Sequence, residues 1–179
     1  MVAYHDTEWG VPCHDDKKLF EYVVLDTFQA GLSWQIILRK REGFRKAFKN
    51  FDAKKVAVMG ERDVLRLMQD AGIVRNRLKI AGTIKNARVF LAVQKEFGLF
   101  SDYIWQFVGG KTIDSKHKHG SSIGTHSKES DALSNDLKKR GFTFVGTTII
   151  YAFMQGAGLV NDHVVTCFRH KECSSGIRK

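Results

Sequence analysis

The sequence contains a single proline, three cysteines and no long apolar run in its 179 residues. One proline in a chain of this length leaves its helices free to continue without interruption. An odd number of cysteines, Cys13, Cys167 and Cys173, argues against a disulfide scaffold and favours a reducing compartment. No apolar stretch approaches the roughly 20 residues needed to cross a bilayer, and the first residues do not resemble a signal peptide. We therefore expect a cytoplasmic protein whose partner is not a membrane.

Acidic residues are also scarce relative to basic ones. The chain holds 29 Lys and Arg against 19 Asp and Glu, and its formal net charge of +10 is spread along its length. Such a balance favours a polyanionic partner, although many soluble proteins are basic without binding nucleic acid. The hydrophobic fraction of 43% and the 13 Phe indicate a folded core. The length fits one domain, predicted over residues 1–179 and expected to be a monomer.

Apolar residues recur at helical spacing through most of the chain, which predicts an all-α fold, a compact helical bundle. Between Lys17 and Lys40, two apolar helices are expected to meet at Ala30-Gly31-Leu32. A long helix is expected after Ile73, with Lys79, Lys85 and Arg88 on its solvated side. Shorter helices are predicted around two further apolar groups, Val56, Val58 and Met59, and Val64, Leu65, Leu67 and Met68.

Residues 109–128 interrupt this pattern. The segment is rich in Gly, Ser, Lys and His and holds only two Ile, which is typical of a flexible surface loop. Its histidines, His117, His119 and His126, are spaced in a way that suggests a metal site. Because no Cys or carboxylate cluster accompanies them, we interpret them as solvated loop residues.

Residues 130–158 have the pattern of a helix-hairpin-helix, a DNA-binding element made of two helices and a tight connection. Gly141 can end the first helix with a positive φ, and Gly146 lets a phosphate approach the exposed N–H groups of the second. Such backbone donors bind phosphates without base preference. The alternative is an ordinary αα-hairpin with a solvated basic end. The candidate DNA contacts are Lys138, Lys139, Arg140, Gly146, Thr147 and Thr148.

Five segments, in order and covering nearly the whole chain, resemble the bacterial 3-methyladenine DNA glycosylase I family of the helix-hairpin-helix superfamily. They are Tyr4-His5-Asp6-Thr7-Glu8-Trp9-Gly10-Val11-Pro12, Gln29-Ala30-Gly31-Leu32-Ser33-Trp34, Asp70-Ala71-Gly72-Ile73-Val74-Arg75, Leu137 through Thr148, and Gly158-Leu159-Val160-Asn161-Asp162-His163-Val164-Val165.

The resemblance implies an all-α enzyme, cytoplasmic and bacterial, whose N- and C-termini pack together. Its expected partner is double-stranded DNA carrying alkylated purines, from which it would flip out 3-methyladenine and hydrolyse the N-glycosidic bond. No lysine falls at a matched pocket position, so a monofunctional glycosylase without a lyase step is expected.

The resemblance also implies the residues of a base pocket. Tyr4 and Trp34 match its aromatic walls, and Trp9 is expected to support the pocket or to belong to the core. Asp26 falls where the family carries Glu, as the acid that recognises the flipped base and stabilises the developing sugar cation. Asp keeps the charge but is one methylene shorter, so the backbone must lie closer or a water must bridge. Glu21 is the fallback candidate for this role.

Gly31 and Leu32 lie at the predicted turn between two helices. The resemblance suggests that they fill the gap in the duplex from which the base has left, since an apolar wedge can replace lost stacking. The alternative for Leu32 is a core residue at a helix junction.

His163 and Cys167 are spaced four apart and suit zinc, on one face of a helix if the segment is helical. The resemblance implies a structural zinc that clamps the two termini, and His5 matches a third ligand. The family's fourth ligand is a Cys upstream of the tyrosine-histidine segment, and it has no counterpart here. Cys13, Cys173 or a water would complete the site, or the protein is metal-free.

Two other functions compete with the glycosylase. A helix-hairpin-helix module without enzymatic activity would bind duplex DNA with a steep salt dependence and leave methylated bases in place. A metal-dependent nuclease drawing on Asp6, Glu8 and the histidines would cut strands and lose activity with a chelator.

Overall fold

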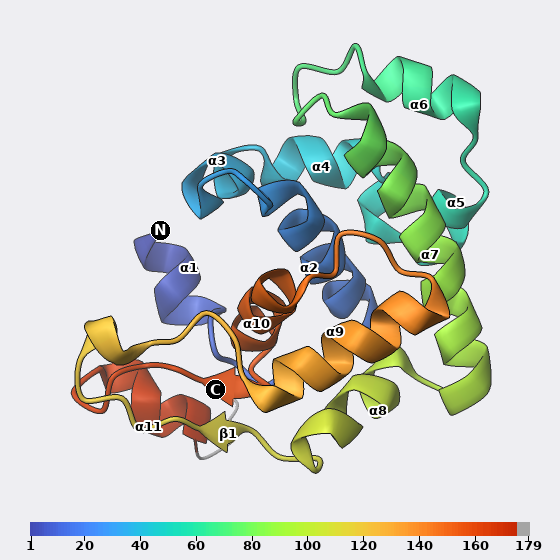
Figure 1. The fold of residues 1–179 in the computed structure, drawn as a ribbon. Coiled ribbons are helices and arrows are strands. Elements are labelled where there is room, and N and C mark those ends of the chain that lie inside the picture. The colour runs from blue at the N-terminus through green and yellow to red at the C-terminus, as the bar shows by residue number, and fades with distance from the viewer. Residues whose placement is uncertain (175–179) are drawn as a thin grey trace.

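The computed structural model describes residues 1–174, and its architecture is helical, with one two-stranded sheet in that part of the chain (Figure 1). The all-α prediction is therefore confirmed. The α-helices are α1 Val2–Thr7, α2 Asp16–Gln29, α3 Trp34–Arg39, α4 Arg41–Ala47, α5 Ala53–Ala57, α6 Glu61–Leu67, α7 Arg77–Phe97, α8 Phe100–Trp105, α9 Lys128–Arg140, α10 Thr147–Gly156 and α11 Phe168–Ser174. Three short 3₁₀ turns, η1 Lys49–Phe51, η2 Gln106–Val108 and η3 Gly120–Ser122, and the strands β1 Ile113–Asp114 and β2 Val160–Asn161 complete the described part.

Helix α2 forms the centre of the molecule. Ten consecutive residues, 19–28, are buried, as expected of a helix that is apolar on all sides. It contacts α10, α7, α8 and α3 and lies among them in Figure 1. Aromatic rings fill the space around it, with Phe20 against Phe90 and Phe28 against Phe44 at centroid distances of 5.1 and 4.7 Å. The two acidic side chains within this run, Glu21 and Asp26, are therefore buried.

The predicted break after α2 is present, and a buried lysine stabilises it. Gly31 adopts a φ of +80°, a conformation that glycine accepts without strain, and α3 begins three residues later. Lys79 Nζ donates hydrogen bonds to the carbonyls of Phe28 and Ala30, at 2.9 and 2.5 Å. The prediction that Lys79 lies on the solvated side of α7 is wrong, because these unpaired carbonyls at the end of α2 bind its ammonium group.

The helices after α4 follow the predictions, but two of them end earlier than predicted, which leaves Met59 beyond α5 and Met68 beyond α6. The long helix is present as α7, and the Asn76 side chain caps it by accepting a hydrogen bond from Lys79 N. The helix predicted around Val56 ends at Ala57, so Val58 lies beyond it and is 84% exposed. Arg88 Nε donates to the carbonyl of Ala57, which ties α7 to this end of α5.

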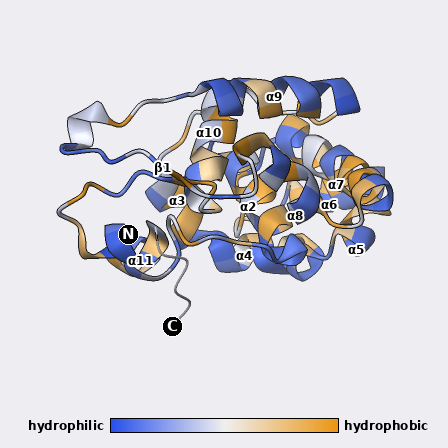
Figure 2. Cartoon of the chain, turned by 90° about the horizontal axis from the view of Figure 1, so that it is seen from below, coloured by the Kyte–Doolittle hydropathy of each residue, from blue (hydrophilic) through white to orange (hydrophobic). Residues whose placement is uncertain are grey.

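Helices α9 and α10 are joined by residues 141–146, as predicted for the hairpin. Gly141 ends α9 in the left-handed conformation, at a φ of +101°. Asn86 on α7 holds the connection, because its amide both donates to Thr143 O and accepts from Thr143 N, at 2.9 and 2.8 Å. Figure 2 shows α9 along one edge of the molecule with mainly hydrophilic residues. Its apolar residues, among them Leu133 and Leu137, are buried.

The two ends of the chain pack together, as the resemblance implies. Gly10 N donates to Gln155 O, and Cys13 N donates to Ala157 O, both at 3.0 Å. At Gly158 a side chain is excluded, since a Cβ atom there would lie 2.4 Å from the backbone of Val11. The N-terminal segment thus crosses directly over the end of α10.

The segment 109–128 is mostly irregular, as predicted, but it is attached to the body. Strand β1 pairs in parallel with β2, with Ile113 opposite Val160 and Asp114 opposite Asn161. Val165 N also donates to His117 O at 2.8 Å. Sequence patterns did not predict this pairing. The domain prediction extends over residues 175–179, which lie outside the described part. Among residues 1–174 no helix has the length and apolar character to span a membrane.

Candidate active site

One hollow of about 350 Å³ lies between α1, α2, α3 and α10. It brings together four residues that the sequence assigned to a base pocket, Tyr4, Trp9, Asp26 and Trp34. A hollow of this size accommodates a purine base, and it combines aromatic faces with a single acid. The remaining lining residues are Met1, His5, Gln29, Ala152 and Gln155.

The rings of Tyr4 and Trp34 are close neighbours in the lining of this hollow. Their ring centroids are 5.4 Å apart, and the ring planes are tilted by 59°. A flat base between two parallel rings needs about 7 Å, twice a contact distance of about 3.5 Å. One ring must therefore rotate before a base can stack between them. The indole Nε1 of Trp34 is buried without a hydrogen-bond partner in the described chain, which leaves it available as a donor.

The acid of the hollow is Asp26, which lies in the last turn of α2. It is 5% exposed, and no described residue donates a hydrogen bond to its carboxylate. Burial raises the pKa of Asp26 well above its usual value, because the charged form loses its hydration. Burial, with the nearby Asp26, also raises the pKa of Tyr4, whose phenol therefore stays protonated. Such a carboxylate gains most from a ligand that supplies positive charge and N–H donors together.

The fallback acid, Glu21, lies in a separate ion cluster. Its Oε1 accepts from Arg41 Nε at 2.7 Å and from Arg45 at 3.4 Å, and its Oε2 accepts from Lys18 at 3.4 Å. Glu8 belongs to the same cluster, since Arg41 holds both of its oxygens at 2.7 Å. The hydrogen bonds from Arg41 lower the pKa of Glu8 to about 2. Because Glu8 follows α1 directly, the cluster fastens the helix that carries Tyr4.

Three predicted metal ligands, His5, His163 and Cys167, lie side by side at the junction of the two chain ends. The Sγ of Cys167 is 3.6 Å from both His5 Nε2 and His163 Nδ1, and all three ligand atoms lie within 4.8 Å of one another. The segment 163–167 is a turn before α11, and this turn brings the ligands together without a helix. Neither of the other cysteines belongs to this group in the described chain.

The other nitrogen of each imidazole is also occupied. His5 Nδ1 lies 2.7 Å from Asp6 Oδ1, and His163 Nε2 lies 3.0 Å from Trp9 O. Partners of this kind fix the orientation and tautomer of histidines that bind metal. Donor type, spacing and outer partners therefore all fit zinc.

The predicted DNA contacts fall on two surfaces. Gly31 and Leu32 are exposed on the turn between α2 and α3, so Leu32 is not a core residue in this structure. Lys138 and Lys139 are exposed at the end of α9. Arg140 instead makes internal contacts, through Nε to Asp136 and through both terminal nitrogens to Glu96.

The start of α10 is open to a ligand. Gly146 has no neighbour within 4 Å of the position of a Cβ atom, and within residues 1–174 no side chain caps the helix. Thr148 is exposed, while the Thr147 hydroxyl contacts Asp131 and Ser130 at 2.5 and 2.9 Å. The amides of this first turn point outward from a ten-residue helix, and its dipole favours an anion there.

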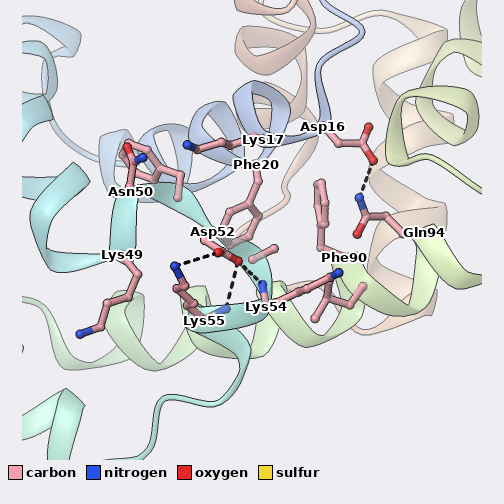
Figure 3. A pocket seen from close by; sticks show the side chains of 13 residues that line it. Asp16, Lys17, Phe20, Lys49, Asn50, Asp52, Lys54, Lys55, Phe90 and Gln94 are labelled. Carbon is pink, nitrogen blue, oxygen red and sulfur yellow. Dashed lines mark hydrogen bonds and ion pairs between the residues drawn. The ribbon is translucent and has the colours of Figure 1, made fainter.

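A second hollow, of about 400 Å³, lies at the other end of α2 and is drawn in Figure 3. Aromatic side chains and several lysines line it, but its two acids, Asp16 and Asp52, have structural roles. Asp16 accepts from Gln94 Nε2 and from the backbone of Phe100 and Ser101, while Asp52 caps α5. This hollow thus lacks an acid that is free to act on a ligand.

Sequence patterns missed Gln29 and Gln155, which also line the first hollow. A glutamine inside an apolar helix such as α10 is the signal that could have identified Gln155, because burial of an amide requires polar partners.

Together these features define a helical protein with one hollow suited to a flat, positively charged ring. Residues 1–170 match the model of the methyladenine glycosylase family, and the chain belongs to this family. The prediction from the sequence motifs is thereby confirmed.

Proteins with known names are similar to this chain over most of its length. DNA-3-methyladenine glycosylase 1 of Escherichia coli (strain K12) is 55% identical over 166 residues, covering 93% of this chain and 89% of that protein. DNA-3-methyladenine glycosylase of Haemophilus influenzae is 48% identical, covering 93% and 90%. Among solved structures, 3-methyladenine DNA glycosylase I of Staphylococcus aureus, described for its recognition of 3-methyladenine, superposes with a TM-score of 0.91. It is 38% identical and covers 93% of this chain and 89% of its own.

Proposed function

We propose that this protein is a DNA repair glycosylase that removes 3-methyladenine by hydrolysing its N-glycosidic bond. The observation that carries the proposal is the buried carboxylate of Asp26, which has no hydrogen-bond donor in the described chain and shares a hollow with the rings of Tyr4, Trp9 and Trp34. Membership of the methyladenine glycosylase family agrees with it.

The chemistry of the substrate suits this hollow. Methylation at N3 gives the purine a positive charge and weakens its bond to the sugar. The cation offsets the cost of ionising Asp26 in a buried site, whereas a neutral purine leaves that cost uncompensated. Stacking on Tyr4 and Trp34 adds about 1–3 kcal/mol per base, with a further cation–π contribution. Undamaged bases are therefore rejected by charge.

In the reaction the bond between the sugar C1′ and the purine N9 breaks, and its electron pair leaves with the base. Positive charge then develops on the sugar, where the Asp26 carboxylate stabilises it. Water adds to C1′ and loses a proton, which leaves an abasic site. Since 3-methyladenine leaves as a neutral molecule, it needs little further activation.

Binding of double-stranded DNA is assigned to two surfaces. The amides at the start of α10, with Lys138 and Lys139, bind phosphates without sequence preference, as a helix-hairpin-helix does. Leu32 and Gly31 enter the duplex in place of the flipped base. Arg140 supports the hairpin through its contacts with Asp136 and Glu96.

A structural zinc is part of the proposal. His5 Nε2, His163 Nδ1 and Cys167 Sγ would hold it, and α1, which carries His5, would be fastened to the segment after β2. Bound there, the ion supplies cross-linking and takes no part in hydrolysis. The fourth ligand is assigned to water or to a residue outside this group.

The proposal is tested by incubating the protein with methylated duplex and identifying the bases released. We expect free 3-methyladenine, abasic sites and intact strands, with much slower release by Trp34→Ala and partial recovery by Trp34→Phe. Strand cleavage that a chelator abolishes would instead indicate a nuclease. Salt-dependent binding without release would identify a DNA-binding module.

A further inference from the structure

Asp162 is a second buried acid, and the chemistry above does not use it. It lies just after β2 and is almost fully buried. Ser115 Oγ donates to its Oδ1 at 2.5 Å, and His117 Nε2 lies 3.3 Å from the same oxygen. Tyr151 Oη and Gln155 Nε2 donate to its Oδ2 at 2.8 and 2.7 Å. Both oxygens are thus satisfied, as a buried carboxylate requires.

The position of Asp162 joins two parts of the fold. Ser115 and His117 belong to the loop segment that β1 attaches to the body, whereas Tyr151 and Gln155 lie four residues apart on one face of α10. Gln155 also lines the hollow that contains Asp26. A single side chain therefore connects the Asp162 network to the proposed base pocket.

The network fixes the orientation of the Gln155 amide. Because Gln155 Nε2 donates to Asp162 Oδ2, the NH₂ group of the amide faces Asp162. The flipped amide would place its carbonyl oxygen against Asp162 Oδ2, where two acceptors repel each other. Within residues 1–174 no group donates a hydrogen bond to the remaining atom, Oε1. Because Gln155 lines the hollow, Oε1 is the acceptor that it has left for a ligand.

We propose that Gln155 is a specificity-determining residue that accepts a hydrogen bond from the exocyclic amino group of the base, and that Asp162 is its positioning residue. The inference rests on the proposed function. Adenine carries an amino donor at C6, whereas guanine carries a carbonyl acceptor there. Oε1 pairs with the first and repels the second.

Charge alone does not achieve this selection. Methylation at N3 makes both adenine and guanine nucleosides cationic, so an anionic Asp26 attracts either. Gln155 is neutral and lies on α10, and it selects a base by its hydrogen-bonding pattern where Asp26 selects by charge. The expected substrate class is therefore N3-methylated purines with an amino group at C6.

The test compares kcat/KM for release of 3-methyladenine and of 3-methylguanine from methylated duplex. Gln155→Met keeps the length of the side chain but removes the acceptor, and we expect 3-methyladenine release to fall about 10- to 100-fold. Release of 3-methylguanine should not fall and should rise, because the acceptor that repels its carbonyl oxygen is gone. Gln106→Met, an exposed glutamine on η2, is the matched control and should leave both rates unchanged.

Asp162→Asn tests the positioning role. Its amide offers a donor as well as an acceptor, which allows Gln155 to turn over, so the preference for 3-methyladenine should fall while the protein stays folded. Affinity for undamaged duplex and the melting temperature report folding independently of the pocket. Gln155→Ala provides a second variant if Gln155→Met does not fold.

The outcomes separate this inference from the proposed function. If the wild type releases no 3-methyladenine, the glycosylase assignment fails. A second outcome concerns an active wild type. If Gln155→Met and Gln155→Ala lower the release of 3-methyladenine and of 3-methylguanine by the same factor, or change neither rate, the role of Gln155 is overturned. An unchanged preference in folded Asp162→Asn overturns the role of Asp162.

Discussion

Glu8→Gln should weaken the attachment of α1, which carries Tyr4 and His5 into the proposed pocket. In the folded protein the pKa of Glu8 is about 2, against 4.5 without its partners, chiefly because of hydrogen bonds from Arg41. The difference corresponds to about 3 kcal/mol, at about 1.4 kcal/mol for each pKa unit. The side chain is 25% exposed, so solvent screening reduces the expected loss to about 2–3 kcal/mol.

The assay is thermal unfolding across pH. For a chain of this size, about 2–3 kcal/mol corresponds to a fall in melting temperature of roughly 4–12 °C. Because the pKa of Glu8 is depressed, its stabilisation is complete above the unfolded value of 4.5 and disappears as pH falls through about 2. The gap between wild type and Glu8→Gln should therefore be full at pH 7 and close on acidification.

Glu42→Gln is the control, since Glu42 also pairs with an arginine, Arg45, but its side chain is 74% exposed. It should melt close to the wild type. Equal melting temperatures of Glu8→Gln and Glu42→Gln at pH 7 would refute a stabilising role of the Glu8–Arg41 pair. A difference in melting temperature between wild type and Glu8→Gln that persists undiminished at pH 2 would refute it as well.

Three further predictions concern the DNA surface and the metal. Lys79→Met removes the donors to two carbonyls at the turn before Leu32, and we expect about 1–3 kcal/mol lower stability and slower base release, with unchanged affinity for undamaged duplex. Lys139→Gln should reduce the dependence of log affinity on log salt concentration by about one charge, in a binding titration, and equal slopes would exclude a phosphate contact. Cys167→Ser should lower bound zinc, measured by elemental analysis, and lower the melting temperature, whereas metal content equal to wild type would exclude this site.

Much of the fold could be predicted from the sequence because local patterns determine it. The apolar run of α2 required burial on all sides, and Gly31 and Gly141 marked turns that need a positive φ. Helix α1 was missed, since six residues with no buried side chain carry no apolar periodicity. Val58 was predicted to be helical because it is apolar, although it lies beyond the end of α5 and is exposed.

Local sequence patterns predicted less of the candidate site. Asp26 and Trp34 were identified through the family resemblance, and the hollow that joins them requires the packing of four helices. The Asp162 network depends on the pairing of β1 with β2, whose residues are 47 positions apart, and local pattern does not encode such a contact. Charge likewise identified Arg140 but could not reveal that Glu96 and Asp136 occupy its guanidinium.

The role of the buried acid also has a consequence for stability. Because the pKa of Asp26 is raised, the folded state holds this proton more tightly than the unfolded state, and stability from this group declines as pH rises above 3.8 toward the folded pKa. Asp26→Asn should therefore be at least as stable as wild type at neutral pH, so a loss of activity in this variant reports chemistry and not unfolding.

The most direct measurement is the rate at which folded Asp26→Asn releases 3-methyladenine from methylated duplex. We expect a fall of at least about 100-fold relative to wild type, because the neutral amide no longer stabilises a cation. Release at the wild-type rate would contradict the assignment of Asp26 as the acid that recognises the base.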